Sequence, residues 1–120
     1  MAAGTFNFRI EQGTTYAQLV RVRDGDGNPI DLTGWNVRMD IRETRSKDAP
    51  LVLELTEGND RIQITDAPNG EIIVQLTSVE TANLAASRWP YDVELFDDAT
   101  PAQVIRLLQG TVSVSAEVTE

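Results

Sequence analysis

Residues 35–42 read Trp35-Asn36-Val37-Arg38-Met39-Asp40-Ile41-Arg42, and apolar and polar side chains alternate from one end to the other. Successive side chains of a β-strand point to opposite faces, so a period of two is typical of a strand with one buried and one exposed face. Trp35, Val37 and Met39 share the apolar face. We therefore predict that Trp35 lies in the core and that Arg38 and Arg42 point outward.

The same alternation recurs along most of the chain. The residues that carry it are Phe6, Phe8 and Ile10; Leu51, Leu53 and Leu55; Ile62 and Ile64; Ile72, Val74 and Leu76; Tyr91, Val93 and Leu95; Ile105 and Leu107; and Val112, Val114, Ala116 and Val118. The last two runs form one long C-terminal strand, and its alternation shifts phase at Gly110, which predicts a bulge or bend there. Between Thr14 and Arg23 apolar residues fall on both faces, which predicts a centrally placed strand.

Turn residues separate these runs, and one segment has a helical signature. Asp24–Pro29 is a dense turn cluster, while 67–70 and 97–101 have the composition of hairpin turns. Thr77 and Glu80 form the T-x-x-E capping box of a short helix, which we expect to cross from one sheet to the other. The pattern therefore predicts an all-β, immunoglobulin-like antiparallel β-sandwich with one short helix, occupying residues 1–120 as a single domain.

Composition narrows the possible functions. The chain has 120 residues without Cys or His, which removes thiolate and imidazole chemistry. Its formal charge of −9 disfavours nucleic acid and anionic membranes as partners. The N-terminus does not have the pattern of a signal peptide, and no apolar run approaches the roughly 20 residues that span a bilayer. We expect the protein to be made and kept in the cytoplasm, leaving only by cell lysis.

Acidic clusters offer weak candidates for chemistry. Asp24, Asp26 and Asn28 have the spacing that opens a calcium loop, but Pro29 and Trp35 stand where that loop needs Gly and Glu. A hairpin turn is the favoured interpretation. Adjacent carboxylates such as Asp97 and Asp98 read as solvated surface. We therefore predict no catalytic residue, no metal ligand and no cofactor, and hence a protein that is not an enzyme.

A surface for binding partners is the remaining possibility. Basic residues gather at the outer positions of 38–42 and in the loop that follows, and two aromatic residues lie near a strand entrance; the candidates are Arg38, Arg42, Arg45, Lys47, Trp89 and Tyr91. The basic group could dock an acidic partner or form a solvated strand face. If Trp89 and Tyr91 were exposed, they would favour glycan or protein recognition.

Several blocks of the chain resemble a known group of proteins. They are residues 10–13, 26–35 with the string Gly27-Asn28-Pro29-Ile30-Asp31-Leu32-Thr33-Gly34, 37–42, 70–77, 91–95 and 104–112. Together, over about residues 8–119, they resemble bacteriophage and prophage tail-region structural proteins. They are also similar to the N-terminal domain of phage baseplate upper proteins.

The resemblance implies a virion structural protein of immunoglobulin-like fold in or near the tail tip or baseplate, and it brings no catalytic residues. Its partners would be other phage tail or baseplate proteins, with homo-oligomers on the particle as an option. Baseplate upper proteins continue into a shaft and a receptor-binding platform, so for a chain ending at Glu120 we expect an adaptor or assembly subunit, first in the host cytoplasm and then in the virion. A glycan- or host-surface-binding module and a capsid decoration protein are the alternatives.

Overall fold

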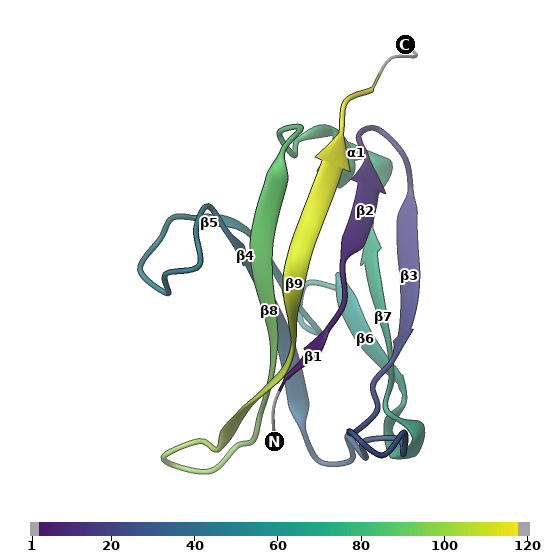
Figure 1. Cartoon of the computed structure of the whole chain (residues 1–120), viewed down its shortest axis with the longest axis vertical. Coiled ribbons are helices and arrows are strands. Elements are labelled where there is room, and N and C mark those ends of the chain that lie inside the picture. Colours follow the sequence, from purple (N-terminus) through teal and green to yellow (C-terminus); the bar gives the residue numbers. More distant parts are fainter. Residues whose placement is uncertain (1–2, 118–120) are drawn as a thin grey trace.

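A computed structural model describes residues 3–117 as two packed β-sheets (Figure 1). Within that range the elements are β1 (Gly4–Thr5), β2 (Phe8–Glu11), β3 (Tyr16–Arg21), β4 (Asn36–Arg42), β5 (Leu51–Thr56), β6 (Ile62–Asp66), η1 (Ala67–Asn69), β7 (Glu71–Leu76), α1 (Ser78–Ala82), β8 (Arg88–Phe96) and β9 (Val104–Ser115). The all-β sandwich with one short α-helix is confirmed. No helix of the described residues is long and apolar enough to cross a membrane.

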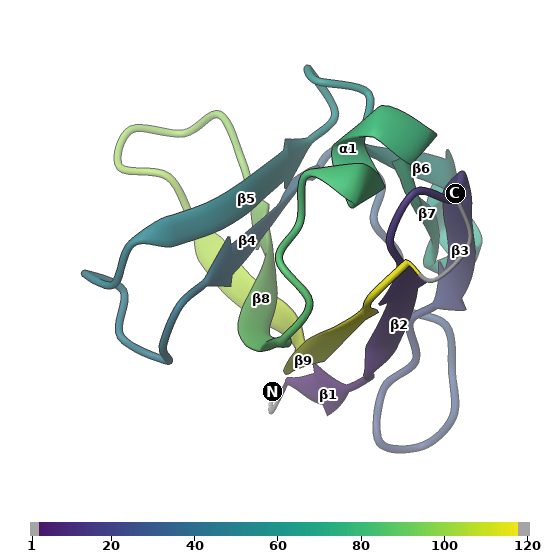
Figure 2. The ribbon, with the colours of Figure 1, turned by 90° about the horizontal axis from the view of Figure 1, so that it is seen from above.

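The strand order explains how the layers form. One sheet has the order β1-β9-β8-β4-β5, with β2 also pairing with β9, and the other has the order β3-β7-β6 (Figure 2). The orders β5-β4-β8-β9 and β3-β7-β6 correspond to strands C′-C-F-G and B-E-D of an immunoglobulin domain. The expectation of an antiparallel sandwich needs one correction, because β1 and β2 run parallel to β9. No direct loop joins these strands, so their direction is not forced by a hairpin.

The core forms where the inward faces of the two sheets meet. Val37, Met39 and Ile41 of β4 are each 1% exposed, in keeping with the alternation of residues 36–42. Each such side chain contributes about 1.5–3 kcal/mol by leaving water. Trp35 differs from the prediction, because it precedes β4 and is half-buried, packing against the rim of the core.

Strand β3 lies at an edge of its sheet, so the prediction of a central strand was wrong. Its six residues pair with β7 alone, in an unbroken register from Tyr16↔Leu76 to Arg21↔Glu71. Leu19 is 39% exposed on the outer face and lies opposite Ile73. The extra apolar residue therefore makes a cross-strand pair on the surface, and it does not indicate burial on both faces.

The phase shift in β9 occurs three residues before the predicted position, Gly110. Val93 pairs with Leu108 while Glu94 pairs with Arg106, so the extra residue lies at Leu107. Both Leu107 and Leu108 are buried as a result. Strand β9 ends at Ser115 and Ala116 is exposed, while Val118 lies outside the described residues.

Gly110, the predicted bulge position, serves a different purpose. Its φ of +156° lies in the region that favours glycine, and a Cβ there would lie 2.2 Å from the carbonyl oxygen of Phe6. Phe6 follows β1, at the interruption between β1 and β2. A glycine at position 110 lets the backbone of the first strands approach β9 closely.

The predicted helix and turns form as expected. The Thr77 hydroxyl accepts from the Glu80 amide at 3.1 Å and the Glu80 carboxylate accepts from the Thr77 amide at 2.8 Å, completing the capping box of α1. This helix connects β7 to β8 and so crosses between the sheets. Residues 67–70 join β6 to β7, and residues 97–101 lie in the connection between β8 and β9; both pairs are antiparallel hairpins.

The Asp24–Pro29 segment is a turn held by its own carboxylate. Asp24 Oδ1 accepts from the amides of Asp26 and Asn28 at 2.9 and 3.0 Å, and Arg23 bridges to Pro29 across the turn. Among residues 3–117 no group of three or more carboxylates is placed to hold a metal ion. The carboxylate of Asp24 therefore has a role in shaping the loop.

Side chains occupy backbone groups at one end of the outer edge of β5. The Thr56 amide donates to Asn59 Oδ1 at 2.9 Å, and Asn59 Nδ2 donates to the Glu54 carbonyl at 3.0 Å. Arg61 Nη1 donates to the same carbonyl at 2.9 Å. Because β5 pairs only with β4, these contacts occupy backbone groups that another strand would otherwise reach.

Candidate interaction groove

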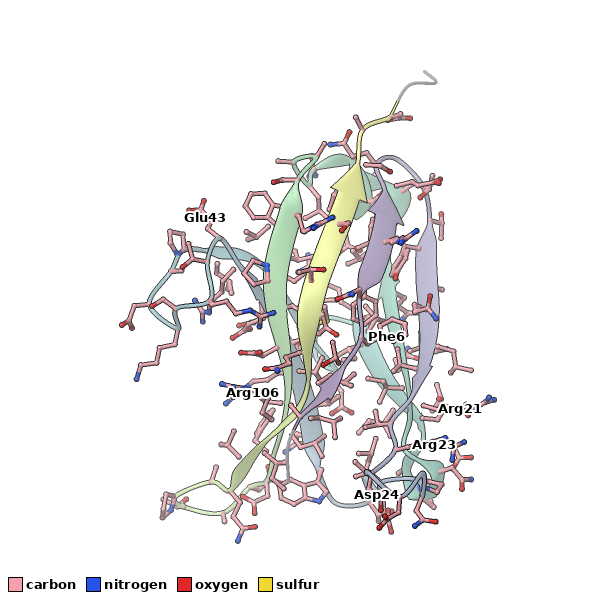
Figure 3. All side chains as sticks on the ribbon, in the orientation of Figure 1. Phe6, Arg21, Arg23, Asp24, Glu43 and Arg106 are labelled. Atoms are coloured by element: carbon pink, nitrogen blue, oxygen red, sulfur yellow. The ribbon has the colours of Figure 1, made fainter. Side chains whose placement is uncertain are left out.

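The outer face of the larger sheet carries a groove of about 430 Å³. It lies over β4, β8 and β9 and is walled by the β4–β5 loop. Figure 3 shows Arg106 of β9 projecting on the same side as the loop that begins with Glu43. The lining residues are Arg38, Asp40, Arg42, Thr44, Arg45, Lys47, Glu54, Pro90, Tyr91, Asp92, Glu94 and Arg106.

The floor of the groove consists of two charged rows that run across the strands. The alternation that buries one face of β4 sends its polar residues to the other. In one row Arg38 lies opposite Glu94, which lies opposite Arg106. In the next, Glu54, Asp40 and Asp92 lie opposite one another. Three adjacent carboxylates repel one another, so the second row requires nearby cations.

Two arginines of β4 supply some of the positive charge that balances the carboxylates of the groove. Arg38 Nε lies 3.1 Å from Glu94 Oε1, and its guanidinium carbon lies 4.7 Å from the centre of the Phe96 ring. Arg42 Nη2 lies 3.3 Å from Asp40 Oδ2. Its Nη1 donates to the Ala49 carbonyl at 2.8 Å, which ties β4 to the loop. Partly exposed pairs of this kind contribute roughly 0–1 kcal/mol each, so their main effect is to orient the side chains.

Asp92 is shared by two cations that come from opposite sides of the groove. Arg45 Nη1 lies 3.5 Å from Asp92 Oδ1, and Arg106 Nε lies 3.7 Å from Asp92 Oδ2. Both distances exceed the roughly 2.7–2.9 Å of a well-formed charge-assisted hydrogen bond. The side chains of Arg45 and Arg106 are 54% and 55% exposed. More than half of each of these side chains is therefore in contact with solvent.

Arg45 also fastens the β4–β5 loop to the sheet. Its Nη2 donates to the Gly110 carbonyl at 2.6 Å and its Nη1 approaches the Tyr91 carbonyl at 3.4 Å. These two carbonyls belong to residues that lie opposite each other in β8 and β9. The loop thus contacts two strands beyond the one from which it emerges.

Replacing Arg45 by alanine is expected to release the loop at a cost of about 1 kcal/mol in the free energy of unfolding, because a charged donor leaves two strand carbonyls. The amides of Glu43 and Ala49, bonded inside the loop to Pro50 and Ser46, should exchange faster with deuterium. Lys47→Ala in the same loop is the control, with an expected effect within about 0.5 kcal/mol. Equal exchange rates in both variants would show that Arg45 does not hold the loop.

The structure brings together only part of the predicted surface. Arg38, Arg42, Arg45 and Lys47 line one groove. Trp89 is half-buried, and its Nε1 approaches the Ala85 carbonyl at 3.4 Å. The side chain of Tyr91, the other aromatic candidate, is buried: it is 2% exposed, packs edge-on against Phe8 and donates its hydroxyl hydrogen to the Phe6 carbonyl. Its inward position follows from the alternation that also buries Val93 and Leu95.

Sequence reasoning missed the other half of the groove. Asp92, Glu94 and Arg106 reach it from β8 and β9, and Asp40 and Glu54 complete the acidic row. Alternation alone places the charged residues of 92–94 on an outer face. Alternation does not say which strands are neighbours. Strand pairing places Arg106 of β9 opposite Glu94 of β8, and Glu94 lies opposite Arg38 of β4.

The two tyrosines of the chain predict that the fold loses stability in alkali: Tyr91 is buried and Tyr16 is half-buried. Burial raises the pKa of Tyr16 from its ordinary value of 10 to about 12. Burial raises the pKa of Tyr91 by more than that of Tyr16, although the nearby positive charge of Arg45 acts to lower it. A raised pKa in the folded state means that stability is complete below pH 10 and declines as the pH rises through the folded pKa. These are the only tyrosines of the chain.

We therefore expect the absorbance of tyrosinate at alkaline pH to stay low until the protein unfolds, and then to rise for both tyrosines together. A spectrophotometric titration, followed in parallel by circular dichroism, checks this. Tyr16→Phe should reduce the loss of stability between pH 10 and about pH 12. A gradual ionisation centred near pH 10 in the folded protein would contradict the burial of these hydroxyls.

The strand order and the core define this chain as an all-β sandwich, and the outer face of its larger sheet carries a charged groove. Among solved structures 117 chains match it. One of them is the N-terminal domain of phage TP901-1 ORF48, with a TM-score of 0.57 and 11% sequence identity over 98% of this chain and 99% of that one. At this identity the similarity is one of fold. No family model and no curated protein matches the sequence.

Proposed function

We propose that this protein is a non-enzymatic structural protein of a phage virion, an adaptor or assembly subunit of the tail or baseplate that acts through contacts with other phage proteins. The observation that carries the proposal is the likeness in fold to the N-terminal domain of phage TP901-1 ORF48 across nearly the full length of both chains. The sequence resemblance to phage tail-region proteins, found on separate grounds, points in the same direction.

The groove supports a binding role. Most of its arginines and carboxylates form ion pairs with one another, and three of the arginines are oriented by further contacts: Arg42 and Arg45 by backbone carbonyls and Arg38 by the Phe96 ring. Arginine is enriched at protein interfaces because its planar donor fork makes directional contacts. A rigid face with oriented arginines therefore suits recognition of another protein.

A glycan-binding module is less well supported. Stacking against a sugar ring requires exposed aromatic faces, whereas Tyr91 is 2% exposed and Trp89 is half-buried against the core. The aromatic residues at this end of β8 contribute to the fold, and they do not line an open platform. Glycan binding and capsid decoration are therefore retained as outcomes of the test.

The test is immunogold electron microscopy of purified phage particles with an antibody against this protein. Labelling confined to the tail tip or baseplate is the expected result, and cross-linking of those particles would identify the neighbouring protein. Labelling of the capsid would contradict the proposal and favour the role of a capsid decoration protein. Unlabelled particles that nonetheless contain the known tail proteins would exclude a virion role and make a glycan array the next experiment.

A further inference from the structure

The charges of the groove do not balance. Five of the ten Lys and Arg residues of the chain line it, together with four carboxylates, so its lining is net positive in a chain with a formal charge of −9. The cations are Arg38, Arg42, Arg45, Lys47 and Arg106, and the carboxylates are those of Asp40, Glu54, Asp92 and Glu94. A concave positive site on an acidic protein selects a partner by local charge.

The ion pairs show where the excess lies. Arg38 pairs with Glu94 and Arg42 with Asp40, one to one. Arg45 and Arg106 both depend on Asp92, at 3.5 and 3.7 Å. Lys47, also in the lining, has no carboxylate of residues 3–117 within ion-pair distance. The end of the groove that holds Arg45 and Arg106 therefore has two guanidiniums for one anion.

We propose that a carboxylate side chain of a partner protein binds between Arg45 and Arg106, with Lys47 at the rim. A second anion would match the two guanidiniums one to one, and each arginine can present a pair of parallel N–H donors to a carboxylate. Arg45 is already oriented by the Gly110 carbonyl, so little side-chain freedom is lost on binding. The proposal rests on the proposed function for the source of the partner and adds its chemistry.

A basic side chain is the competing occupant, because Glu54, Asp40 and Asp92 form a row of carboxylates. Asp40 and Asp92 already contact arginines. Asp40 Oδ1 is the one buried side-chain oxygen without a hydrogen-bond partner among residues 3–117, and an incoming side chain does not reach it. Glu54 is exposed and forms no ion pair with the described residues, but it lies on β5, separated from Asp92 by β4. At the end of the groove that holds Arg45 and Arg106, the guanidinium-bearing side chains are more exposed than Asp92, and they favour an anion.

The experiment is an NMR titration of the purified full chain with acetylated hexaglutamate amide, and separately with hexalysine amide. A salt concentration near 0.15 M limits the reach of the chain's remaining charge to about 8 Å. We expect hexaglutamate to shift the Arg45 and Arg106 side-chain Nε–H signals and the Asp92 amide. Arg106→Gln should weaken the binding about fivefold, as expected for the loss of roughly 1 kcal/mol.

Arg21→Gln is the matched control. It removes the same charge from an exposed arginine that pairs with Glu71 on the other sheet, and it should change the affinity for hexaglutamate by less than twofold. Equal weakening by both variants, the absence of shifts at the groove, or preferential binding of hexalysine there would each overturn the proposal.

The NMR titration tests the carboxylate site and the particle labelling tests the virion role, so a negative result in one leaves the other proposal standing. Gold at the tail without hexaglutamate binding would leave the virion role intact and remove the carboxylate site. Hexaglutamate binding that depends on Arg106, in a protein absent from particles, would keep the chemistry of the groove and remove the proposed function.

Discussion

Tyr91→Ala is expected to lower the free energy of unfolding by about 3–5 kcal/mol, the usual cost of removing a large aromatic ring from a core. Tyr91 is 2% exposed, and its ring lies 5.1 Å from that of Phe8 in an edge-on arrangement. The loss leaves a cavity between β8 and β2. Urea unfolding followed by tryptophan fluorescence measures the effect.

Tyr91→Phe is the matched variant, because it keeps the ring and removes only the hydroxyl that donates to the Phe6 carbonyl. We expect a loss of about 1–2 kcal/mol, since one acceptor loses its partner. If the phenylalanine variant were as unstable as the alanine variant, the hydroxyl and not the ring would hold this region. If Tyr91→Ala cost less than about 1 kcal/mol, the burial described here would be wrong.

Gly110→Ala is the second large change, with an expected loss of about 3 kcal/mol or more. The new Cβ would lie 2.2 Å from the Phe6 carbonyl oxygen, at a φ of +156° that side chains rarely adopt. Either the first strands move away from β9 or the backbone of β9 changes. Urea unfolding gives the magnitude, and faster amide exchange in residues 8–11 would show that β2 has loosened.

Gly25→Ala provides the control for this substitution. Gly25 lies in the exposed turn after Asp24, where a Cβ would meet no atom within 4 Å. Its expected effect is within about 0.5 kcal/mol. Similar stabilities of the two variants would mean that the close approach at Gly110 is not required.

The parts of the fold that depend on neighbouring residues could be predicted from the sequence. Alternation in residues 35–42 placed Val37, Met39 and Ile41 inside and Arg38 and Arg42 outside. The capping box located α1, because Thr77 and Glu80 act across a single turn. In each case the cause and its effect lie within a few residues of one another.

Errors arose where the answer depends on residues far along the chain. Leu19 suggested a central strand, yet its apolar neighbour is Ile73 on the surface of the same sheet. Gly110 suggested a bulge. A glycine is needed there because the carbonyl oxygen of Phe6, near the other end of the chain, leaves no room for a Cβ. The groove was half predicted for the same reason, since Asp92 and Arg106 join the β4 arginines only through strand pairing.

The side chains at the outer edge of β5 affect how neighbouring copies of the protein meet. Wherever many copies of a sandwich lie close together, an open strand edge tends to fuse with any other, without regard to sequence. Asn59 and Arg61 occupy backbone groups of Glu54 and Thr56 that such fusion would use. At this end of β5, an approaching copy therefore meets side chains, whose shape and charge can distinguish one partner from another.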